Sequence, residues 1–265
     1  KEKNITKAEE ISPYLNLSKD EEVKLNEILK KYPMSITPYY LSLVDFNDPD
    51  DPIKKMCIPS IAETDLSGSF DTSGEADNTV VTGVQHKYRE TVIVLSTNHC
   101  AMYCRHCFRK RLVGLSDEEI AKYFDEMIEY IKEHKEISNV LISGGDSFCN
   151  SNAKIEKYLR ELIEIEHLDL IRFGTRIPVV YPQRISKDYN LKKILKSYCK
   201  KKQIYVVTQF NHPREVTKEA KESIEALKEA GIIVKNQTVL LKGVNDNSET
   251  LGKLLKKLTS IGVIP

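Results

Sequence analysis

The sequence predicts an α/β fold with a parallel sheet that follows a helical N-terminal region. Five short runs rich in β-branched residues alternate with segments of helical periodicity. From the second run onwards the runs start about 30 residues apart, the usual length of a strand–helix–strand unit with parallel strands. The runs are Thr91–Ser96, Asn139–Ser143, Leu170–Gly174, Gln203–Thr208 and Ile232–Leu241. This pattern does not distinguish a barrel from an open sheet.

The N-terminal third precedes these runs and has a different composition. Between Ser18 and Lys31 apolar residues recur at helical spacing, which predicts a helix. The stretch Pro49–Gly83 is rich in Pro, Asp, Ser and Gly, which is typical of a long irregular connection. We therefore expect residues 1–85 to form a helical extension with a linker, and residues 86–265 to form the α/β domain.

Two helices between the runs carry recognisable end signals. Ser116 is followed three residues later by Glu119, a capping box, and the apolar face that starts there continues to Ile131. The segment Thr217–Ala230 predicts a second helix, which Gly231 closes as a C-terminal cap.

The last residues look like an interrupted repeat of the same unit. A helix is expected from Ser248 to Leu258, and Gly262–Pro265 resembles the first residues of a sixth strand. The sequence also begins without methionine. We therefore expect a sixth strand and a C-terminal region to be missing from this chain.

The composition argues against nucleic-acid-binding, membrane-spanning and small secreted disulfide-rich proteins. The 265 residues carry a net charge of +1, so no global attraction to nucleic acid or to a membrane surface is expected, and small molecules are the expected partners. No run approaches the roughly 18 apolar residues that cross a bilayer. The six cysteines do not form the dense even framework of a small secreted protein. We expect a cytoplasmic protein.

Cys100, Cys104 and Cys107 follow the first run directly, at the strand end where α/β proteins place functional loops. Thiolates at this spacing bind an iron–sulfur cluster or zinc. Structural zinc normally takes four protein ligands, whereas a four-iron cluster on three cysteines leaves one iron open. The same loop carries four basic residues, which favour thiolates: Arg105, Arg109, Lys110 and Arg111. We expect a cluster; zinc completed by His99 or His106 is the alternative.

A glycine-rich turn, Ser143-Gly144-Gly145-Asp146, follows the second run. Glycines let the backbone approach a ligand closely, and backbone amides in such a turn can bind a charged group. An ordinary strand-to-helix turn with Asp146 near the helix start is the alternative. Its position next to the cysteine loop favours a role in binding whatever occupies the open iron.

These motifs resemble a known family. The spacing Cys-x3-Cys-x2-Cys resembles the signature of the radical S-adenosylmethionine (SAM) superfamily, and the segment from Cys100 to Arg111 resembles its lysine 2,3-aminomutase family. Further segments similar to that family are Thr37–Leu43, His86–Tyr88, Ser143–Asp146, Arg176–Val180, Phe210–Pro213 and Asn236–Asp246.

The resemblance implies a partial (β/α)6 TIM-like barrel with a [4Fe-4S] cluster on the three cysteines and SAM on the open iron. Reductive cleavage of SAM would give a 5′-deoxyadenosyl radical that abstracts hydrogen from an amino acid, whose amino group then undergoes 2,3-migration. The cofactors carry this chemistry, and the protein orients them. The implied partners are an amino-acid substrate such as lysine, an electron donor such as flavodoxin or ferredoxin, and further copies of the chain in a homo-oligomer.

The resemblance also implies roles for single residues. Gly144, Gly145 and Asp146 would lie along the methionine part of SAM, and Gln237 would lie on the SAM side of the site. Arg109 would grip the substrate carboxylate, since a guanidinium forms two parallel hydrogen bonds with a carboxylate that a lysine cannot copy.

Pyridoxal 5′-phosphate is a further cofactor of the family, and its use here is an open alternative. Lys87 and Tyr88 match a patch that contacts it, but Thr91 stands where the aminomutases have an arginine for its phosphate, and the Schiff-base lysine lies in the missing region. Gln209 likewise replaces a histidine that faces SAM. The alternatives are a radical SAM relative without pyridoxal phosphate that acts on another substrate, and a zinc-stabilised binding module.

Overall fold

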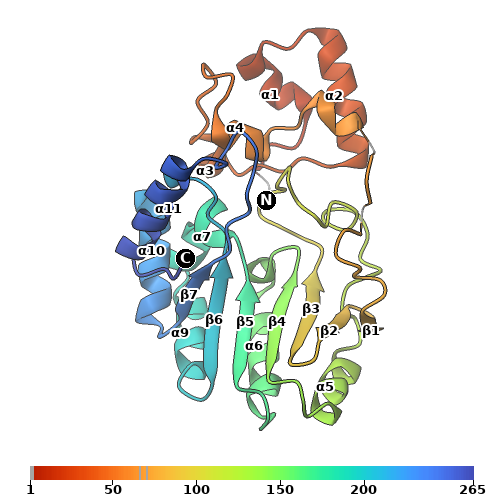
Figure 1. Cartoon of the computed structure of the whole chain (residues 1–265), viewed down its shortest axis with the longest axis vertical. Coiled ribbons are helices and arrows are strands. Elements are labelled where there is room, and N and C mark those ends of the chain that lie inside the picture. Colours follow the sequence, from red (N-terminus) through yellow and green to blue (C-terminus); the bar gives the residue numbers. More distant parts are fainter. Residues whose placement is uncertain (1–2, 66, 70) are drawn as a thin grey trace.

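The computed structural model describes residues 3–65, 67–69 and 71–265. One seven-stranded sheet has helices along it, and the predicted α/β class with a parallel sheet is confirmed (Figure 1). The strands lie in the sheet in chain order: β1 (Thr79–Val81), β2 (Val84–Tyr88), β3 (Thr91–Thr97), β4 (Asn139–Gly144), β5 (Leu170–Gly174), β6 (Gln203–Thr208) and β7 (Ile233–Asn236). Among the described strands β1 and β7 are the two edges, so the sheet does not close.

The helices fall into an N-terminal group and a group that connects the strands. The first group is α1 (Ala8–Leu15), α2 (Lys19–Lys31), α3 (Pro38–Leu41), α4 (Pro52–Cys57) and the 3-10 turn η1 (Ile61–Thr64). The second is α5 (Phe124–Glu133), η2 (Ser147–Cys149), α6 (Asn152–Ile163), α7 (Ile177–Val180), α8 (Gln183–Ser186), α9 (Tyr189–Tyr198), η3 (Pro213–Glu215), α10 (Lys218–Glu229) and α11 (Ser248–Ser260).

Strands β3 to β7 are parallel, with each strand paired to the next one in the chain. Side chains in register, such as Ile142 beside Phe173 and Phe173 beside Val206, are fully buried beneath the helices. Such burial of apolar surface is the main favourable contribution to folding. Because the strands are parallel, their carboxyl ends all meet at one edge of the sheet.

Several predicted helices are confirmed, together with their caps. Ser18 and Glu21 form a capping box at the start of α2. Thr217 caps α10, and Gly231 follows that helix with a positive φ of 86°. Helix α11 begins at Ser248, as predicted.

The helix predicted from Ser116 is wrong in its first two turns, because α5 begins only at Phe124. The Ser116 carbonyl accepts a hydrogen bond from Asn98 Nδ2 at 3.0 Å, and the Ala121 amide donates to Leu95 O at 2.8 Å. Ile120 packs against Leu95 and Leu112. These tertiary contacts hold residues 116–121 near the carboxyl end of β3, where they do not form a local helix.

The strand predicted over Ile232–Leu241 ends early, at Asn236. The Asn236 side chain bonds both the amide and the carbonyl of Phe210, so side-chain bonds replace the ladder at that point. Ile264 then forms a single parallel bridge with Lys235, at the position where a sixth parallel strand would lie.

The stretch predicted as irregular, Pro49–Gly83, contains short regular elements. Asp51 caps α4 through the Lys54 amide, and Thr79–Val81 forms strand β1, which pairs antiparallel with β2. The β1–β2 hairpin extends the parallel sheet beyond β3. No described helix is long and apolar enough to span a bilayer.

The N-terminal helices lie over the carboxyl ends of the parallel strands (Figure 1). The Tyr103 amide donates to Ser35 O at 2.9 Å, and the Arg105 amide donates to Met56 O at 3.0 Å. Thr37 Oγ1 donates to Val180 O at 2.6 Å. The loop after β3 is thus enclosed between the sheet edge and the N-terminal segment.

Candidate active site at the carboxyl edge of the sheet

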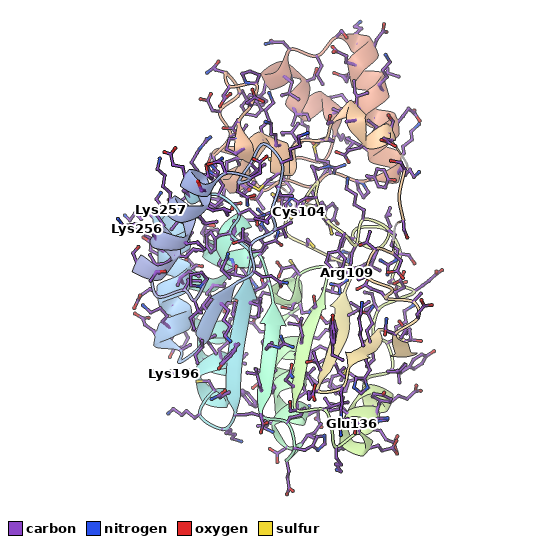
Figure 2. All side chains as sticks on the ribbon, in the orientation of Figure 1. Cys104, Arg109, Glu136, Lys196, Lys256 and Lys257 are labelled. Carbon is purple, nitrogen blue, oxygen red and sulfur yellow. The ribbon has the colours of Figure 1, made fainter. Side chains whose placement is uncertain are left out.

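The three cysteines of the predicted cluster site lie in the loop that leaves β3 at its carboxyl end, and all three are partly buried. Figure 2 shows Cys104 and Arg109 above the strand ends. Among the described residues no three Cys, His, Asp or Glu side chains are arranged so that they could hold a metal ion. The loop brings the thiols into one region without setting them at ligand positions.

Burial shapes the chemistry of the thiols. It raises the pKa of Cys100 well above its ordinary value, with Asp146 and Cys149 adding to the effect, and it raises the pKa of Cys107 to about 11. Both thiols are therefore protonated at neutral pH in the metal-free protein. A metal or cluster would have to displace these protons, since only the thiolate binds metal.

Cys104 differs because it accepts a charged hydrogen bond. Arg176, which follows β5, donates from Nη1 to Cys104 Sγ at 2.8 Å. A hydrogen bond from a charged guanidinium is stronger than one from a neutral donor. The donor set therefore fits a thiolate-ligated cluster: three cysteines on one loop and a buried cation aimed at one of the sulfurs.

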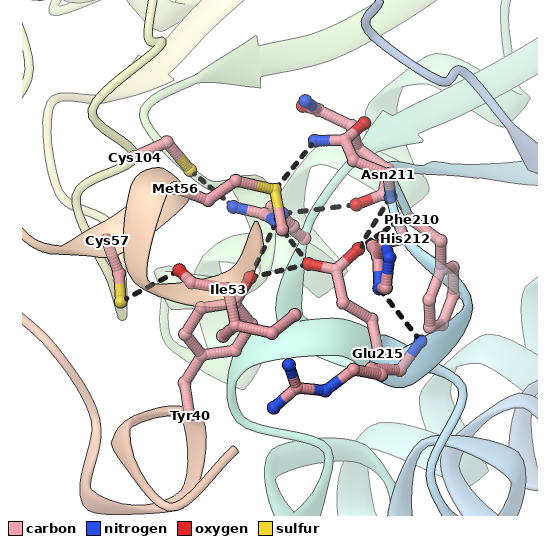
Figure 3. A network of polar contacts seen from close by, with 12 residues as sticks. Tyr40, Ile53, Met56, Cys57, Cys104, Phe210, Asn211, His212 and Glu215 are labelled. Carbon is pink, nitrogen blue, oxygen red and sulfur yellow. Dashed lines mark hydrogen bonds and ion pairs between the residues drawn. The ribbon is translucent and has the colours of Figure 1, made fainter. Parts of the chain in front are cut away.

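Figure 3 shows a buried polar network that includes Cys104, Tyr40 and Glu215, and Arg176 forms a hydrogen bond with each of these three. Its Nη2 lies 2.5 Å from Glu215 Oε1 and 3.2 Å from the Tyr40 hydroxyl, and its Nε donates to Gln209 O at 3.1 Å. Burial and Glu215 raise the pKa of Tyr40 well above its ordinary value, so its hydroxyl stays protonated and donates to Glu215 at 2.6 Å. Glu215 Oε2 accepts the Asn211 amide at 2.6 Å.

His106, between two of the cysteines, faces the loop after β6. Its Nε2 lies 3.0 Å from Gln209 Nε2, and its Nδ1 is buried without a hydrogen-bond partner in the described part of the chain. Burial, helped by the charges of Arg176 and Lys110, lowers the pKa of His106 to about 3. The imidazole is thus neutral at pH 7. Among the residues that the structure describes, His106 belongs to no group of side chains that could hold a metal ion.

The glycine-rich turn after β4 supports the start of the cysteine loop. The Gly145 amide donates to Thr97 O at 2.5 Å, and the Asp146 amide donates to His99 O at 2.8 Å. A Cβ on Gly145 would lie 2.4 Å from His99 O, and Gly144 has a φ of 108°. Both positions therefore require glycine because the backbone of the cysteine loop passes so close.

Asp146 is fully enclosed and links two strand ends. Its Oδ1 accepts from Thr175 Oγ1 at 2.6 Å, and its Oδ2 accepts the Arg176 amide at 2.7 Å. Burial raises the pKa of Asp146, although these hydrogen bonds oppose the shift. The carboxylate thereby holds the backbone of Arg176 in place; contact of Gly144, Gly145 and Asp146 with SAM stays a prediction.

The predicted substrate-binding residue, Arg109, is buried and bound to other groups of the chain. Its Nε and Nη2 lie 2.8 and 2.7 Å from Glu75 Oε1. Its Nη1 donates to Ser143 Oγ at 3.1 Å and to Gly144 O at 3.3 Å. Arg109 thus reaches the glycine-rich turn, as a site residue should, and already binds a carboxylate.

The other basic residues of the loop pair with carboxylates rather than with the thiols. Glu63 accepts from Arg105 at 2.5 Å and from Lys110 at 2.8 Å. Arg111 pairs with Glu75 at 2.9 Å and with the half-exposed Glu119 at 2.7 Å. The general basic environment inferred for the cysteines is therefore largely neutralised, and Arg176 supplies the direct contact.

Of the remaining predicted residues, one lies at the carboxyl ends of the parallel strands and two lie near their amino ends. Gln237 follows β7 at the carboxyl edge, where its amide donates to Thr208 O at 2.9 Å. Lys87 and Tyr88 lie in β2, where Tyr88 pairs with Thr91 at the start of β3, roughly 20 Å of strand from the cysteine loop. Lys87 Nζ donates to Ser73 O at 2.8 Å. The structure does not bring this pair to the cysteines.

Comparison with known proteins identifies the family. A family model described as the radical SAM superfamily matches residues 94–255. The chain is also 45% identical, over 97% of its length, to a provisionally named L-lysine 2,3-aminomutase of Aquifex aeolicus, of which it covers 69%. The chain belongs to the radical SAM superfamily, within the lysine 2,3-aminomutase family. The resemblance inferred from the motifs is confirmed, as is the enzyme class.

Other relatives of this radical SAM chain carry related names. It is 41% identical over 98% of its length to the L-lysine 2,3-aminomutase of Acetoanaerobium sticklandii, of which it covers 63%. It is 39% identical over 98% of its length to the glutamate 2,3-aminomutase of Clostridioides difficile, of which it covers 61%. Membership of the superfamily implies a [4Fe-4S] cluster and SAM as cofactors.

Sequence reasoning did not single out four residues that organise the site: Tyr40, Glu75, Arg176 and Glu215. Arg176 and Glu215 follow β5 and β6 at the functional edge of the sheet, and that position was a usable signal. Tyr40 and Glu75 come from the N-terminal third, where no local pattern indicates a contact with the sheet.

Proposed function

We propose that this chain binds a [4Fe-4S] cluster and SAM and acts on an amino acid by 2,3-migration of its amino group. The observation that carries the proposal is the hydrogen bond from the buried Arg176 to Cys104, the middle member of a three-cysteine loop at the carboxyl edge of the sheet. The relatives named as lysine and glutamate 2,3-aminomutases support the reaction type.

Cys100, Cys104 and Cys107 would hold the cluster, with one iron open because the loop offers no fourth thiol. When bound, the cluster and SAM supply one-electron chemistry and a radical that abstracts hydrogen. The chain's own contribution is to orient and cover the site: Arg176 fixes Cys104, the turn at Gly145 fixes the start of the loop, and the N-terminal segment binds the loop through backbone hydrogen bonds. Gln237 would lie on the SAM side.

Arg109 would bind the carboxylate of the amino-acid substrate. It lies beside the glycine-rich turn, is held there by Ser143 and Gly144, and presents one guanidinium edge that binds a carboxylate in this structure. Lysine and glutamate share an α-carboxylate, so this contact does not select between them. The amino-acid substrate and a flavodoxin- or ferredoxin-like electron donor are the partners we propose.

A second candidate is a radical SAM enzyme that does not use pyridoxal phosphate. Tyr88 is 63% exposed, and Thr91 Oγ1 donates to Asn139 Oδ1 at 3.2 Å, so neither forms a phosphate pocket with Lys87. Protein purified with added pyridoxal phosphate would show a Schiff-base or cofactor absorption band after desalting if the cofactor binds. Protein that shows no such band before cluster reconstitution and that cleaves SAM after it would favour this candidate.

Replacing Cys104 with Ala tests the cluster assignment. We expect anaerobically reconstituted Cys104→Ala to lose nearly all bound iron and sulfide and to form no 5′-deoxyadenosine from SAM and dithionite. Cys199→Ala is the matched control, since Cys199 lies after α9, away from the loop, and should keep both. Full cluster content in Cys104→Ala, or zinc without iron and sulfide in the unaltered protein, would refute the proposal and favour a zinc-binding module.

A further inference from the structure

Within the described part of the chain, four of the five guanidinium N–H groups of Arg109 already bind other groups. One edge of its guanidinium contacts Glu75 Oε1, while Nη1 is bound to Ser143 Oγ and Gly144 O. Both partners of the ion pair are buried, with side chains 7% and 4% exposed. A substrate carboxylate can form two parallel hydrogen bonds with Arg109 only if the Glu75 carboxylate leaves the Nε–Nη2 edge.

Glu75 is held over Arg109 by a tight turn formed by residues 71–78. Asp71 accepts the amides of Glu75 and Ala76 at 2.8 and 2.9 Å, and Asn78 Nδ2 donates to Gly74 O at 2.5 Å. Lys87 in β2 secures the same turn through Ser73 O. The Glu75 carboxylate is therefore held at Arg109 by a turn that several hydrogen bonds stabilise.

Arg111 offers Glu75 a second partner. Its Nη2 lies 2.9 Å from Glu75 Oε2, whereas Arg109 contacts Oε1, and Arg111 also contacts Glu119. Burial raises the pKa of Glu75, but the hydrogen bonds and charges of Arg109 and Arg111 outweigh it and lower the pKa overall. Glu75 can therefore give up Arg109 while Arg111 still compensates its charge.

We propose that Glu75 is a specificity-determining residue that occupies the substrate-carboxylate position on Arg109 and is exchanged for that carboxylate on binding. The inference rests on the proposed role of Arg109 in amino-acid binding. It requires no covalent step: one carboxylate replaces another on the same guanidinium, and Glu75 keeps its contact with Arg111. Ligands that lack a carboxylate cannot drive the exchange, so the site discriminates against amides and amines.

The test compares the full chain with Glu75→Gln and with Glu63→Gln. The control is closely matched, because Glu63 also bridges two basic residues of the cysteine loop, Arg105 and Lys110, but does not touch Arg109. Binding of L-lysine and L-lysinamide, and of acetate and acetamide, is measured by NMR titration of the cluster-free protein. The acetate pair makes the result independent of the substrate side chain.

Removing the competing carboxylate raises the fraction of chains with an open Arg109, and apparent affinity rises with that fraction. We expect Glu75→Gln to bind L-lysine and acetate at least about tenfold more tightly than the unaltered chain does, with binding of the amides unchanged. Glu63→Gln should bind all four probes as the unaltered chain does. Glu75→Asp, whose shorter side chain reaches Arg109 less well, should show a smaller gain of the same kind.

Unchanged or weaker carboxylate binding in folded Glu75→Gln and Glu75→Asp would overturn the inference and leave Glu75 as a purely structural partner of Arg109. An equal gain for carboxylates and amides would overturn it too. Because the titration needs neither cluster nor SAM, it fails independently of the proposed function, which instead depends on iron, sulfide and 5′-deoxyadenosine measurements.

Discussion

At the scale of single residues, the buried guanidinium of Arg176 does the most to connect the site. It contacts Cys104 in the loop after β3, Tyr40 in α3, Gln209 after β6 and Glu215 in η3. A fully buried cation is costly unless it is paired and hydrogen-bonded, and here every part of the guanidinium has a partner. The network therefore stabilises the fold only while all its members are present, because removing one leaves a buried charge without its partner.

Replacing Glu215 with Gln tests this dependence. The substitution leaves Arg176 buried without a countercharge, so we expect the free energy of unfolding to fall by roughly 3 kcal/mol. Urea denaturation of the metal-free protein measures it. The control is Glu249→Gln, which removes a carboxylate from the exposed pair with Lys253 and should leave the midpoint unchanged. Equal midpoints for both variants would contradict the importance assigned to the network.

At the scale of elements, the site depends on the close approach of two adjacent strand ends. Strand β3 passes into the cysteine loop and β4 into the glycine-rich turn, and two backbone hydrogen bonds join them at Thr97 and His99. Only glycine leaves room for this approach at position 145. The turn therefore fixes the position of the backbone directly before Cys100.

Gly145→Ala should displace the cysteine loop. The new Cβ would meet the backbone of His99 at 2.4 Å, and backbone cannot move aside as a flexible side chain does. We expect a loss of stability of roughly 1–3 kcal/mol and a lower iron content after reconstitution. Gly252→Ala in α11, where nothing lies within 4 Å of the added Cβ, should instead stabilise the protein by up to about 1 kcal/mol.

The iron content of Gly145→Ala separates two roles for the turn. A normal iron content together with normal stability would show that the turn can relax without moving the loop. A normal stability with lost iron would assign the turn to ligand binding alone.

At the scale of the whole molecule, the N-terminal helices and the sheet edge together bury groups that would otherwise titrate. Cys100, Cys107 and His106 are all held neutral by this enclosure, the first two with raised and the last with a lowered pKa. Each such group couples folding to pH, because the unfolded chain exposes it to water.

The metal-free protein should be most stable between about pH 6.5 and 9, the ordinary pKa values of His and Cys. Below pH 6.5 the unfolded chain binds a proton that folded His106 refuses until about pH 3, so stability falls with pH by up to about 1.4 kcal/mol per unit. Above pH 9 the unfolded thiol ionises before folded Cys107 does, so stability falls again.

Urea denaturation at several pH values measures this profile. His106→Asn should flatten the acidic side and leave the alkaline side unchanged. A profile that His106→Asn does not alter would contradict the assignment of the acidic limb to this histidine.

Much of the site was accessible from the sequence because its residues follow strand ends in order. The parallel pattern placed the cysteine loop and the Gly144–Gly145 turn at one edge of the sheet. Gln237 was placed there only by the family resemblance, because the pattern put it inside the run Ile232–Leu241. The capping box at Ser116 failed because bonds to Asn98 and Leu95 outweighed a local cap. The end of β7 was missed for a similar reason, since side-chain bonds from Asn236 replaced the ladder.

The strand–helix alternation, the parallel sheet and the family could be predicted from the sequence, because they depend on periodicity and on motifs that are contiguous in the chain. Which charges meet is known only from the folded structure. Arg109 pairs with Glu75 across 34 residues, and Arg176 reaches Tyr40 across 136. No local pattern encodes such pairs, since they form only when burial removes water and makes an unpaired charge too costly to leave.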